Sequence, residues 1–312
     1  MKQYLQVALF ILALTGCIKE NVVESPSQEA ITFNDAFVSN VTRAADPSTT
    51  AATLTAFDVW GFVKEYDGTV FVDQDVEFQD GMWVYSGTQY WVPEQTYYFA
   101  ALAPMNSPNI KEDLATGEAA KKGLGTITFT NTDGTEDLLY SAVSVKSGGI
   151  NDINNPISLQ FNHLLTKVKF TFGNGFITDN VAVKVTNVRM DVPSKASIDL
   201  ARDDYSKGWD LIGSETINLN FGDVDTINST KRNEAANERL IIPTGPQQRY
   251  TVTFDIEILI GNVSAYNISK TSAIAGVALE MGKAYNFTTE INPDNLEFSS
   301  IVFDVVQVDK WI

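Results

Sequence analysis

The sequence predicts an all-β protein made of tandem β-sandwich domains with few short helices. Short segments rich in Val, Ile, Thr, Phe, Tyr and Trp recur along the chain, and many alternate between apolar and polar positions. Turn signals such as Asp67-Gly68 and Asp80-Gly81 separate them, whereas helical signals are few. The length of 312 residues allows two domains, and the 44% of hydrophobic residues can fill two cores.

The N-terminus reads as a targeting segment. Lys2 precedes an apolar run, Tyr4–Leu14, which has the length of a signal peptide and is too short to span a bilayer comfortably. Leu14-Thr15-Gly16-Cys17 follows and fits a bacterial lipobox. We therefore interpret residues 1–16 as a lipoprotein signal peptide and Cys17 as the lipidation site, which would anchor the precursor to a membrane. The alternative is a plain signal peptide with a chance Cys.

A tether and a strand come next, in residues 17–43. Ile18–Gln28 is polar, and Ile31–Val41 alternates as a half-buried strand does, with Asp35 and Ser39 as exceptions. Four residues are predicted to share its buried face: Ile31, Phe33, Phe37 and Val41. The following polar stretch, residues 42–50, contains Pro47 and is expected to be accessible to proteases.

The remaining chain is predicted to consist almost entirely of strands. A loop-like run, Ser147–Pro156, suggests a boundary between an N-terminal domain (44–156) and a C-terminal domain (157–312). Short helices are conceivable in Asn109–Lys122 and Lys231–Leu240. Representative predicted strands are Thr55–Phe62, Thr69–Phe78, Met82–Tyr85, Thr96–Ala101, Gly125–Thr130, Phe161–Phe172, Val181–Met190, Arg249–Ile260 and Lys283–Ile291.

The last segment, Phe298–Val308, is apolar on both of its faces. One face carries Ile301, Phe303 and Val305, and the other carries Val302, Val306 and Val308. Such a pattern suits a strand buried between two layers. It does not distinguish a strand of the chain's own C-terminal domain from one given to a neighbouring molecule.

Composition excludes several function classes. A net charge of −17 disfavours nucleic-acid binding and docking to anionic lipid. One Cys and one His rule out a disulfide framework within the chain and argue against a structural zinc site. The sequence contains no nucleotide, metal or hydrolase motif, so we expect no cofactor and no enzymatic activity. His163 is interpreted as a buried or half-buried histidine bonded to a neighbour, in preference to a general base.

Three weaker signals carry alternative readings. Asn131–Asp137 loosely resembles a calcium loop but lacks its spacing, so a solvated turn with Gly134 at positive φ is preferred. Aromatic pairs such as Tyr90-Trp91 favour core packing, although exposed Trp91 or Trp209 would support a surface glycan-binding lipoprotein. A hydrolase with a carboxylate pair is the third reading, and no spacing singles out such a pair.

Several motifs follow one another along the chain. The lipobox ending at Cys17 is followed by an alternating strand and then by Thr42-Arg43-Ala44. Further motifs are Phe57–Phe62, Trp83-Val84-Tyr85 with Tyr90–Pro93 and Tyr97–Ala101, Leu159–Val168, Met281–Thr288 and the terminal Val305–Ile312. In this order and spacing they resemble the fimbrillin family, the pilin subunits of type V pili, and most closely its Mfa-like branch. The stretch from Cys17 to Ala44 resembles that family's arrangement, in which an arginine-specific protease cuts after the Arg.

The resemblance implies two transthyretin-like sandwiches and head-to-tail assembly by strand exchange. An arginine-specific surface protease would cut between Arg43 and Ala44, removing the strand with Ile31, Phe33, Phe37 and Val41. The donor strand of the neighbouring subunit, within 298–312, would then enter the vacated groove with Ile301, Phe303, Val305, Val306 and Val308. The resemblance further implies that the lipid on Cys17 anchors the precursor in the outer membrane. It also implies that the mature protein forms a surface fimbria that supports adhesion to a host or bacterial target.

Overall fold

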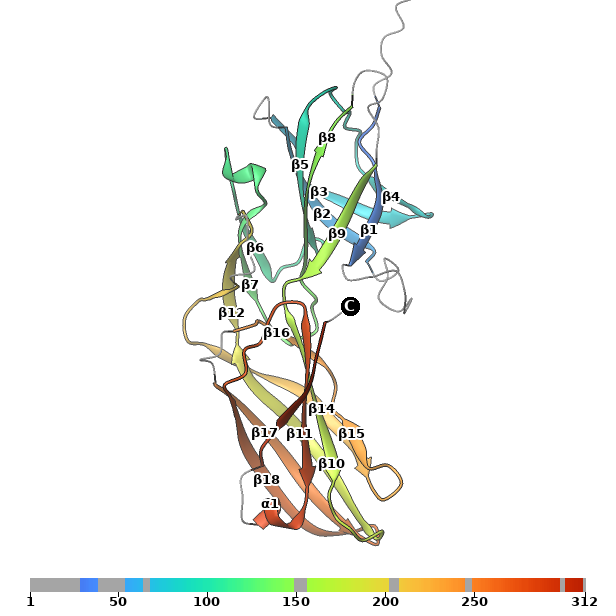
Figure 1. The fold of residues 1–312 in the computed structure, drawn as a ribbon, viewed down its shortest axis with the longest axis vertical. Helices are drawn as coiled ribbons and strands as arrows, with labels where there is room; N and C mark the ends of the chain where they lie inside the picture. Colours follow the sequence, from blue (N-terminus) through green and yellow to red (C-terminus); the bar gives the residue numbers. More distant parts are fainter. Residues whose placement is uncertain are drawn as a thin grey trace, which may run out of the picture.

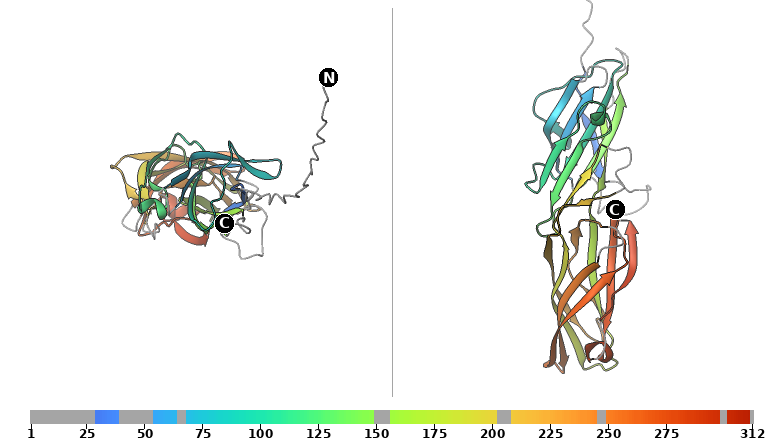
Figure 2. Two further views of the ribbon diagram at one scale, coloured as in Figure 1. Left: turned by 90° about the horizontal axis from the view of Figure 1, so that it is seen from above. Right: turned by 90° about the vertical axis from the view of Figure 1, so that its left-hand side faces the viewer.

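The computed structural model describes residues 29–38, 54–63, 68–148, 156–201, 208–244, 249–297 and 301–310. These residues form an almost entirely β structure, which confirms the predicted all-β class. The molecule is elongated, with two lobes stacked end to end along its long axis (Figure 1, Figure 2). No helix among the described residues is long and apolar enough to cross a membrane.

The first lobe is built on a seven-stranded sheet that curls around one core. The sheet follows the order β1 (Phe33–Val38), β9 (Ile157–His163), β8 (Leu139–Lys146), β5 (Thr96–Ala103), β2 (Ala56–Val63), β3 (Gly68–Gln79) and β4 (Met82–Tyr85). Odd-numbered residues of β2, such as Phe57 and Val59, face this core, because successive side chains of a strand point to opposite faces. Hydrogen bonds from Ile31 and Trp91, just outside β1 and β4, bring the two ends of the sheet together.

A smaller sheet covers the outer face of the large one. It has the order β13 (Asp210–Leu211), β12 (Lys195–Asp199), β7 (Gly125–Thr130) and β6 (Ile110–Leu114). β12 pairs with β7 in antiparallel fashion, so the chain returns to the first lobe after it has entered the second.

The second lobe is a two-layer sandwich. One layer contains β14 (Thr216–Ile227), β11 (Val181–Pro193), β17 (Arg249–Ile260) and β18 (Val263–Ala275). The other contains β15 (Asn233–Ala235), β10 (Thr166–Asn174), β19 (Lys283–Ile291) and β20 (Asp304–Lys310), with β16 (Arg239–Ile241) also paired to β10. Phe170 and Phe287 from one layer pack with Phe221 and Phe254 from the other.

Of the two short helices considered in the sequence, the first is limited to one 3-10 turn and the second is wrong. Residues 110–114 form edge strand β6, and only Ala119–Lys121 within the first segment make a 3-10 turn. The second segment contains the short strands β15 and β16. The α-helix that the described residues do contain is α1 (Pro293–Glu297), whose Leu296 is buried in the second core.

The observed sheets also divide the chain differently from the predicted boundary at residue 156. β9 belongs to the first lobe, and only Leu164 and Leu165 separate it from β10 in the second. A third apolar cluster joins the lobes. Its buried residues include Trp60, Leu102, Ile127, Phe129, Leu164, Leu165, Ile198, Trp209, Leu240 and Ile242.

Candidate assembly groove

β1 lies in a seat between β9 and the segment that follows β4. On one side it pairs with β9 in parallel, with Phe33 opposite Ile157 and Val38 opposite Phe161. On the other side the Ile31 N–H donates to the Gln89 carbonyl at 2.8 Å, and the Trp91 N–H donates to the Glu29 carbonyl at 2.9 Å. The Tyr85 hydroxyl donates to the Ile31 carbonyl at 2.7 Å. β1 is therefore hydrogen-bonded to β9 along one edge, and the residues just before it, 29–31, are hydrogen-bonded to Tyr85 and to residues 89–91 on the other side.

Phe33 is the central side chain of this seat. Its ring is 5% exposed and lies 5.8 to 6.5 Å, centroid to centroid, from four other rings. Those rings belong to Phe57, Phe71, Tyr85 and Phe99. Burial is also the main reason why the pKa of Tyr85 lies above its usual value of 10.0. Such an aromatic cluster gives β1 a large apolar contact area.

The register of β1 changes in its middle, and this corrects one predicted residue. Phe33 is opposite Ile157 but Asp35 is opposite Ser158, so one extra residue is accommodated between them as a β-bulge. After the bulge, Ala36 and Val38 face the core, while Phe37 is 37% exposed. Ile31 and Phe33 are buried as predicted, but Phe37 is on the opposite face. Val41 lies outside the described residues, as do Cys17, Arg43 and Ala44.

Without β1 the seat would be a groove lined with apolar and backbone groups. Phe57, Phe71 and Phe99 would lose their contact with Phe33, and β9 would lose the partner on its outer edge. An unpaired strand edge above an apolar core is a template for another strand. The geometry therefore allows strand replacement.

The candidate donor strand lies within the second lobe. β20 pairs with β19 in antiparallel fashion, with Val305 opposite Phe287 and Val308 opposite Tyr285. Just before it, Ile301 is 2% exposed, and its carbonyl accepts a hydrogen bond from the Ser272 hydroxyl at 2.5 Å. The half-buried ring of Phe303 lies 5.2 Å from Phe170 and 5.8 Å from Phe172. In this structure the segment is thus part of its own lobe.

Other predicted features prove to be structural. His163 is buried, and its Nδ1 lies 3.0 Å from the Asp137 carboxylate. In the Asn131–Asp137 turn, the Gly134 N–H donates to Asn131 and Gly134 has a φ of +72°. No group of three His, Cys, Asp or Glu among the described residues is placed to hold a metal ion.

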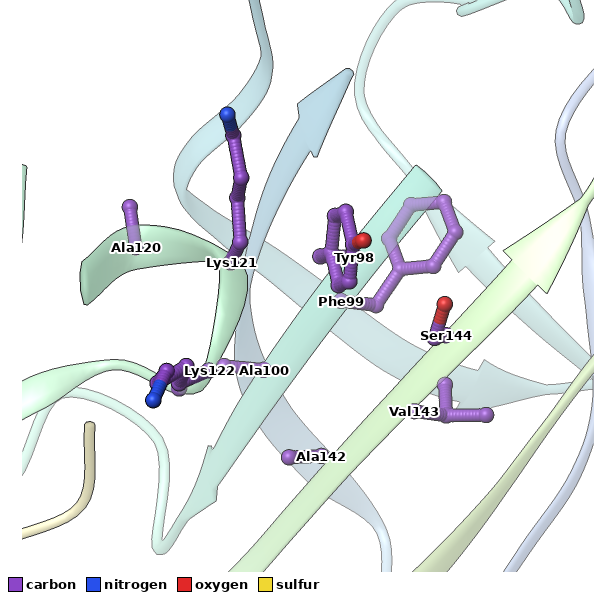
Figure 3. A pocket seen from close by; sticks show the side chains of 10 residues that line it. Tyr98, Phe99, Ala100, Ala120, Lys121, Lys122, Ala142, Val143 and Ser144 are labelled. Atoms are coloured by element: carbon purple, nitrogen blue, oxygen red, sulfur yellow. The ribbon is translucent and has the colours of Figure 1, made fainter. Parts of the chain in front are cut away.

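The aromatic residues proposed as a glycan platform are buried. Trp91 is 3% exposed and Trp209 is 9% exposed, which removes the basis of the glycan-binding reading. A small surface cavity of about 170 Å³ lies elsewhere, between β5, β8 and the 3-10 turn. Tyr98, Ala100, Lys121 and Ser144 are among the residues that line it (Figure 3).

Comparison with known proteins identifies the family. The model of the fimbrillin-like family matches residues 42–311. The chain belongs to the fimbrillin-like family. Fimbrillin-like proteins are structural rather than enzymatic, and membership places this chain among cell-surface proteins. The curated protein sequences contain no match to the chain.

Solved structures share the fold of this fimbrillin-like chain at low sequence identity. A fimbrial protein from Bacteroides vulgatus is 13% identical with a TM-score of 0.64, and the match covers 91% of this chain and 99% of that one. A proposed cell adhesion protein from Bacteroides uniformis is 15% identical with a TM-score of 0.55, with the same coverage. Another, from Bacteroides ovatus, is 13% identical with a TM-score of 0.54, covering 92% and 99%.

The sequence did not predict that the residues just before β1 pair with residues 89–91. The pairing of Glu29 and Ile31 with residues 89–91 joins positions about sixty residues apart. The aromatic pair Tyr90-Trp91 was interpreted as core packing, and Trp91 does pack in the core against Tyr97 at 4.7 Å. Nothing in that pair signals that its backbone also holds β1.

Proposed function

We propose that this protein is the precursor of a fimbrial subunit that polymerises by donor-strand exchange after proteolysis. The observation that carries the proposal is the way β1 is held: its buried side chains are part of the first core. In the sequence, residues 39–53 connect β1 to the strands that follow it. Cleavage between Arg43 and Ala44 would leave β1 held only by non-covalent contacts. A strand from a neighbouring subunit would then replace it, and the donor segment lies within 298–312.

Such contacts are head-to-tail. Because the groove and the donor segment are different parts of one chain, each subunit can accept a strand at one site and give a strand at another. Heterologous contacts of this kind propagate into a filament instead of closing a dimer. Adhesion to a host or bacterial target would be a property of that filament.

Processing is tested by N-terminal sequencing of subunits from purified surface filaments. We expect subunits that begin at Ala44, and we expect Arg43→Ala to leave uncleaved precursor on the cell without filaments. Arg249→Ala, which changes an exposed arginine at the start of β17, serves as the matched control and should polymerise normally. Filaments that are made of subunits still carrying residues 29–38 would contradict the proposal.

Anchoring of the precursor would depend on Cys17. A lipid attached there supplies membrane affinity that the acidic chain itself lacks. Cys17→Ser should therefore abolish incorporation of a palmitate analogue and release the precursor from the membrane fraction. Equal labelling of the wild-type and variant proteins would show that the lipobox is misassigned.

A further inference from the structure

The inward-facing positions of β1 and of the residues just before it follow an unusual spacing. Ile31 and Phe33 face the core before the bulge, and Ala36 and Val38 face it afterwards. Counted from Ile31, the buried positions are thus the first, third, sixth and eighth. A regular strand would instead bury every second residue.

The C-terminal segment repeats this spacing in its sequence. Aligned on Ile301, the same four positions are Ile301, Phe303, Val306 and Val308, all of them apolar. The polar residues Asp304 and Gln307 fall at the positions of Asn34 and exposed Phe37. A bulge at the corresponding place would put these four apolar residues of the segment on one face.

Other alignments fit less well. Without a bulge, a strand with Phe303 in the seat of Phe33 would turn Gln307 towards the core, and a buried amide without a partner is costly. In the opposite direction the four positions remain apolar, but Phe303 would enter the small seat of Ala36, and Val306 would leave a void in the seat of Phe33. Overpacking and cavities both destabilise a core.

The surroundings of Ile301 and Phe303 in the second lobe resemble those of Ile31 and Phe33 in the first. The Ile31 carbonyl accepts a hydrogen bond from the Tyr85 hydroxyl, and the Ile301 carbonyl accepts one from the Ser272 hydroxyl. Phe33 is buried among four rings, whereas Phe303 is half-buried against those of Phe170, Phe172 and Phe254. Transfer of Phe303 into the seat of Phe33 would therefore keep an aromatic environment and bury the ring more completely.

We propose that residues 301–308 of a second copy of this chain enter the groove in the direction of β1, parallel to β9, with the same bulge. Ile301, Phe303, Val306 and Val308 take the seats of Ile31, Phe33, Ala36 and Val38. This inference rests on the proposed strand exchange and adds to it the direction and the register of the donor.

Cysteine cross-linking in filaments tests the register. The natural chain has one Cys, Cys17, and cleavage after Arg43 removes it, so a mature subunit has no other thiol. Exposed Phe37 is opposite exposed Gln160 on β9, so the register places Gln307 beside Gln160 of the neighbouring subunit. Neighbouring strands are about 4.8 Å apart, within the range of Cα distances that a disulfide bridges.

Three double variants distinguish the possible alignments. Q160C with Q307C reports the proposed register, Q160C with V306C reports the same direction without a bulge, and Q160C with V302C reports the opposite direction. Filaments of each are oxidised, dissociated and separated on a non-reducing gel. We expect a ladder of covalent multimers, at least tenfold stronger for the Q307C pair than for the other two, whereas disulfides within one subunit give no ladder.

The outcomes separate this inference from the proposed function. A dominant ladder from the V306C or V302C pair would overturn the register while leaving strand exchange intact. Filaments in which none of the three pairs cross-links would show that residues 301–308 are not the donor. If wild-type subunits cleaved after Arg43 form no filaments at all, the proposed function itself fails.

Discussion

Phe33 and Phe37 are four residues apart on one strand, yet they have opposite roles. The ring of Phe33 packs among four aromatic rings in the core, whereas Phe37 lies on the outer face of the strand. Phe33→Ala should therefore lower the free energy of unfolding of the precursor by about 3–5 kcal/mol, as expected for a buried Phe. Phe37→Ala is the matched control and should cost less than about 1 kcal/mol. Urea denaturation measures both, and equal losses would contradict the assigned register.

Asp58 shows how a buried carboxyl group makes stability depend on pH. Its side chain is 4% exposed, and one oxygen accepts the Asn106 N–H at 2.8 Å while the other has no hydrogen-bond partner. Burial raises the pKa of Asp58 from 3.8 to about 6, and the negative charges of Asp73, Asp75 and Glu112 act in the same direction. The folded state thus holds this proton more tightly than the unfolded state does.

The sign of the effect follows from proton linkage. Because the folded-state pKa of Asp58 is raised, its contribution is most favourable below pH 4 and declines as the pH rises to about 6. Asp58→Asn keeps the shape of the protonated group, so it should raise the free energy of unfolding by about 1–2 kcal/mol at pH 7 and change it little at pH 4. Exposed Asp179→Asn is the control. An equal gain for Asp58→Asn at both pH values would exclude this explanation.

At the scale of elements, local alternation predicted several strands with their observed bounds. The bounds of Met82–Tyr85, Gly125–Thr130, Arg249–Ile260 and Lys283–Ile291 agree with the observed strands. The edge strand β6 was taken for part of a short helix, because it is mostly exposed and lacks a two-residue apolar period. The return of β12 to β7 was also missed, since pairing over that sequence distance leaves no local signal.

The proposed assembly site was likewise predicted only in part from the sequence. Alternation found Ile31 and Phe33 but misplaced Phe37, because a bulge shifts the period by one residue and no residue type in Asn34-Asp35 requires it. The pattern of the C-terminal strand left two readings open. The structure places Ile301 and Phe303 in the second lobe, and this describes the unassembled chain only.

Phe303 should therefore stabilise the precursor's second lobe. Its ring contacts Phe170, Phe172 and Phe254, so Phe303→Ala is expected to cost about 2–3 kcal/mol of unfolding free energy, less than a fully buried Phe would. Val302→Ala, one residue away and 69% exposed, should change it by less than about 0.5 kcal/mol. Thermal unfolding of the two precursors measures the difference. Identical melting temperatures would show that the segment is not part of that core.

At the scale of the whole molecule, the proposed groove and the proposed donor strand are connected by a short path. β20 pairs with β19, β19 pairs with β10, and two residues then lead to β9, which forms one edge of the groove. Those two residues, Leu164 and Leu165, are fully buried in the cluster that joins the lobes. Force applied to a donated strand would thus pass through this junction to the strand held in the groove.

Trp209 contacts both sides of the junction between the lobes. It comes from the segment that returns to the first lobe, packs against Phe129, and donates its Nε1–H to the Leu164 carbonyl at 2.8 Å. Because both lobes share this cluster, we expect the wild-type precursor to unfold in one cooperative transition. Trp209→Ala should remove about 3–5 kcal/mol of packing and separate the lobes into two transitions in differential scanning calorimetry.

The matched control for Trp209→Ala is Leu211→Ala. Leu211 lies two residues further along, in β13, and is 43% exposed, so its loss should leave a single transition with nearly the same midpoint. Filaments of the Trp209 variant should then break more readily under shear than wild-type filaments, although their strand exchange is unimpaired. Two separate transitions in the wild-type protein would show that the lobes unfold independently and that the junction does not couple their stabilities.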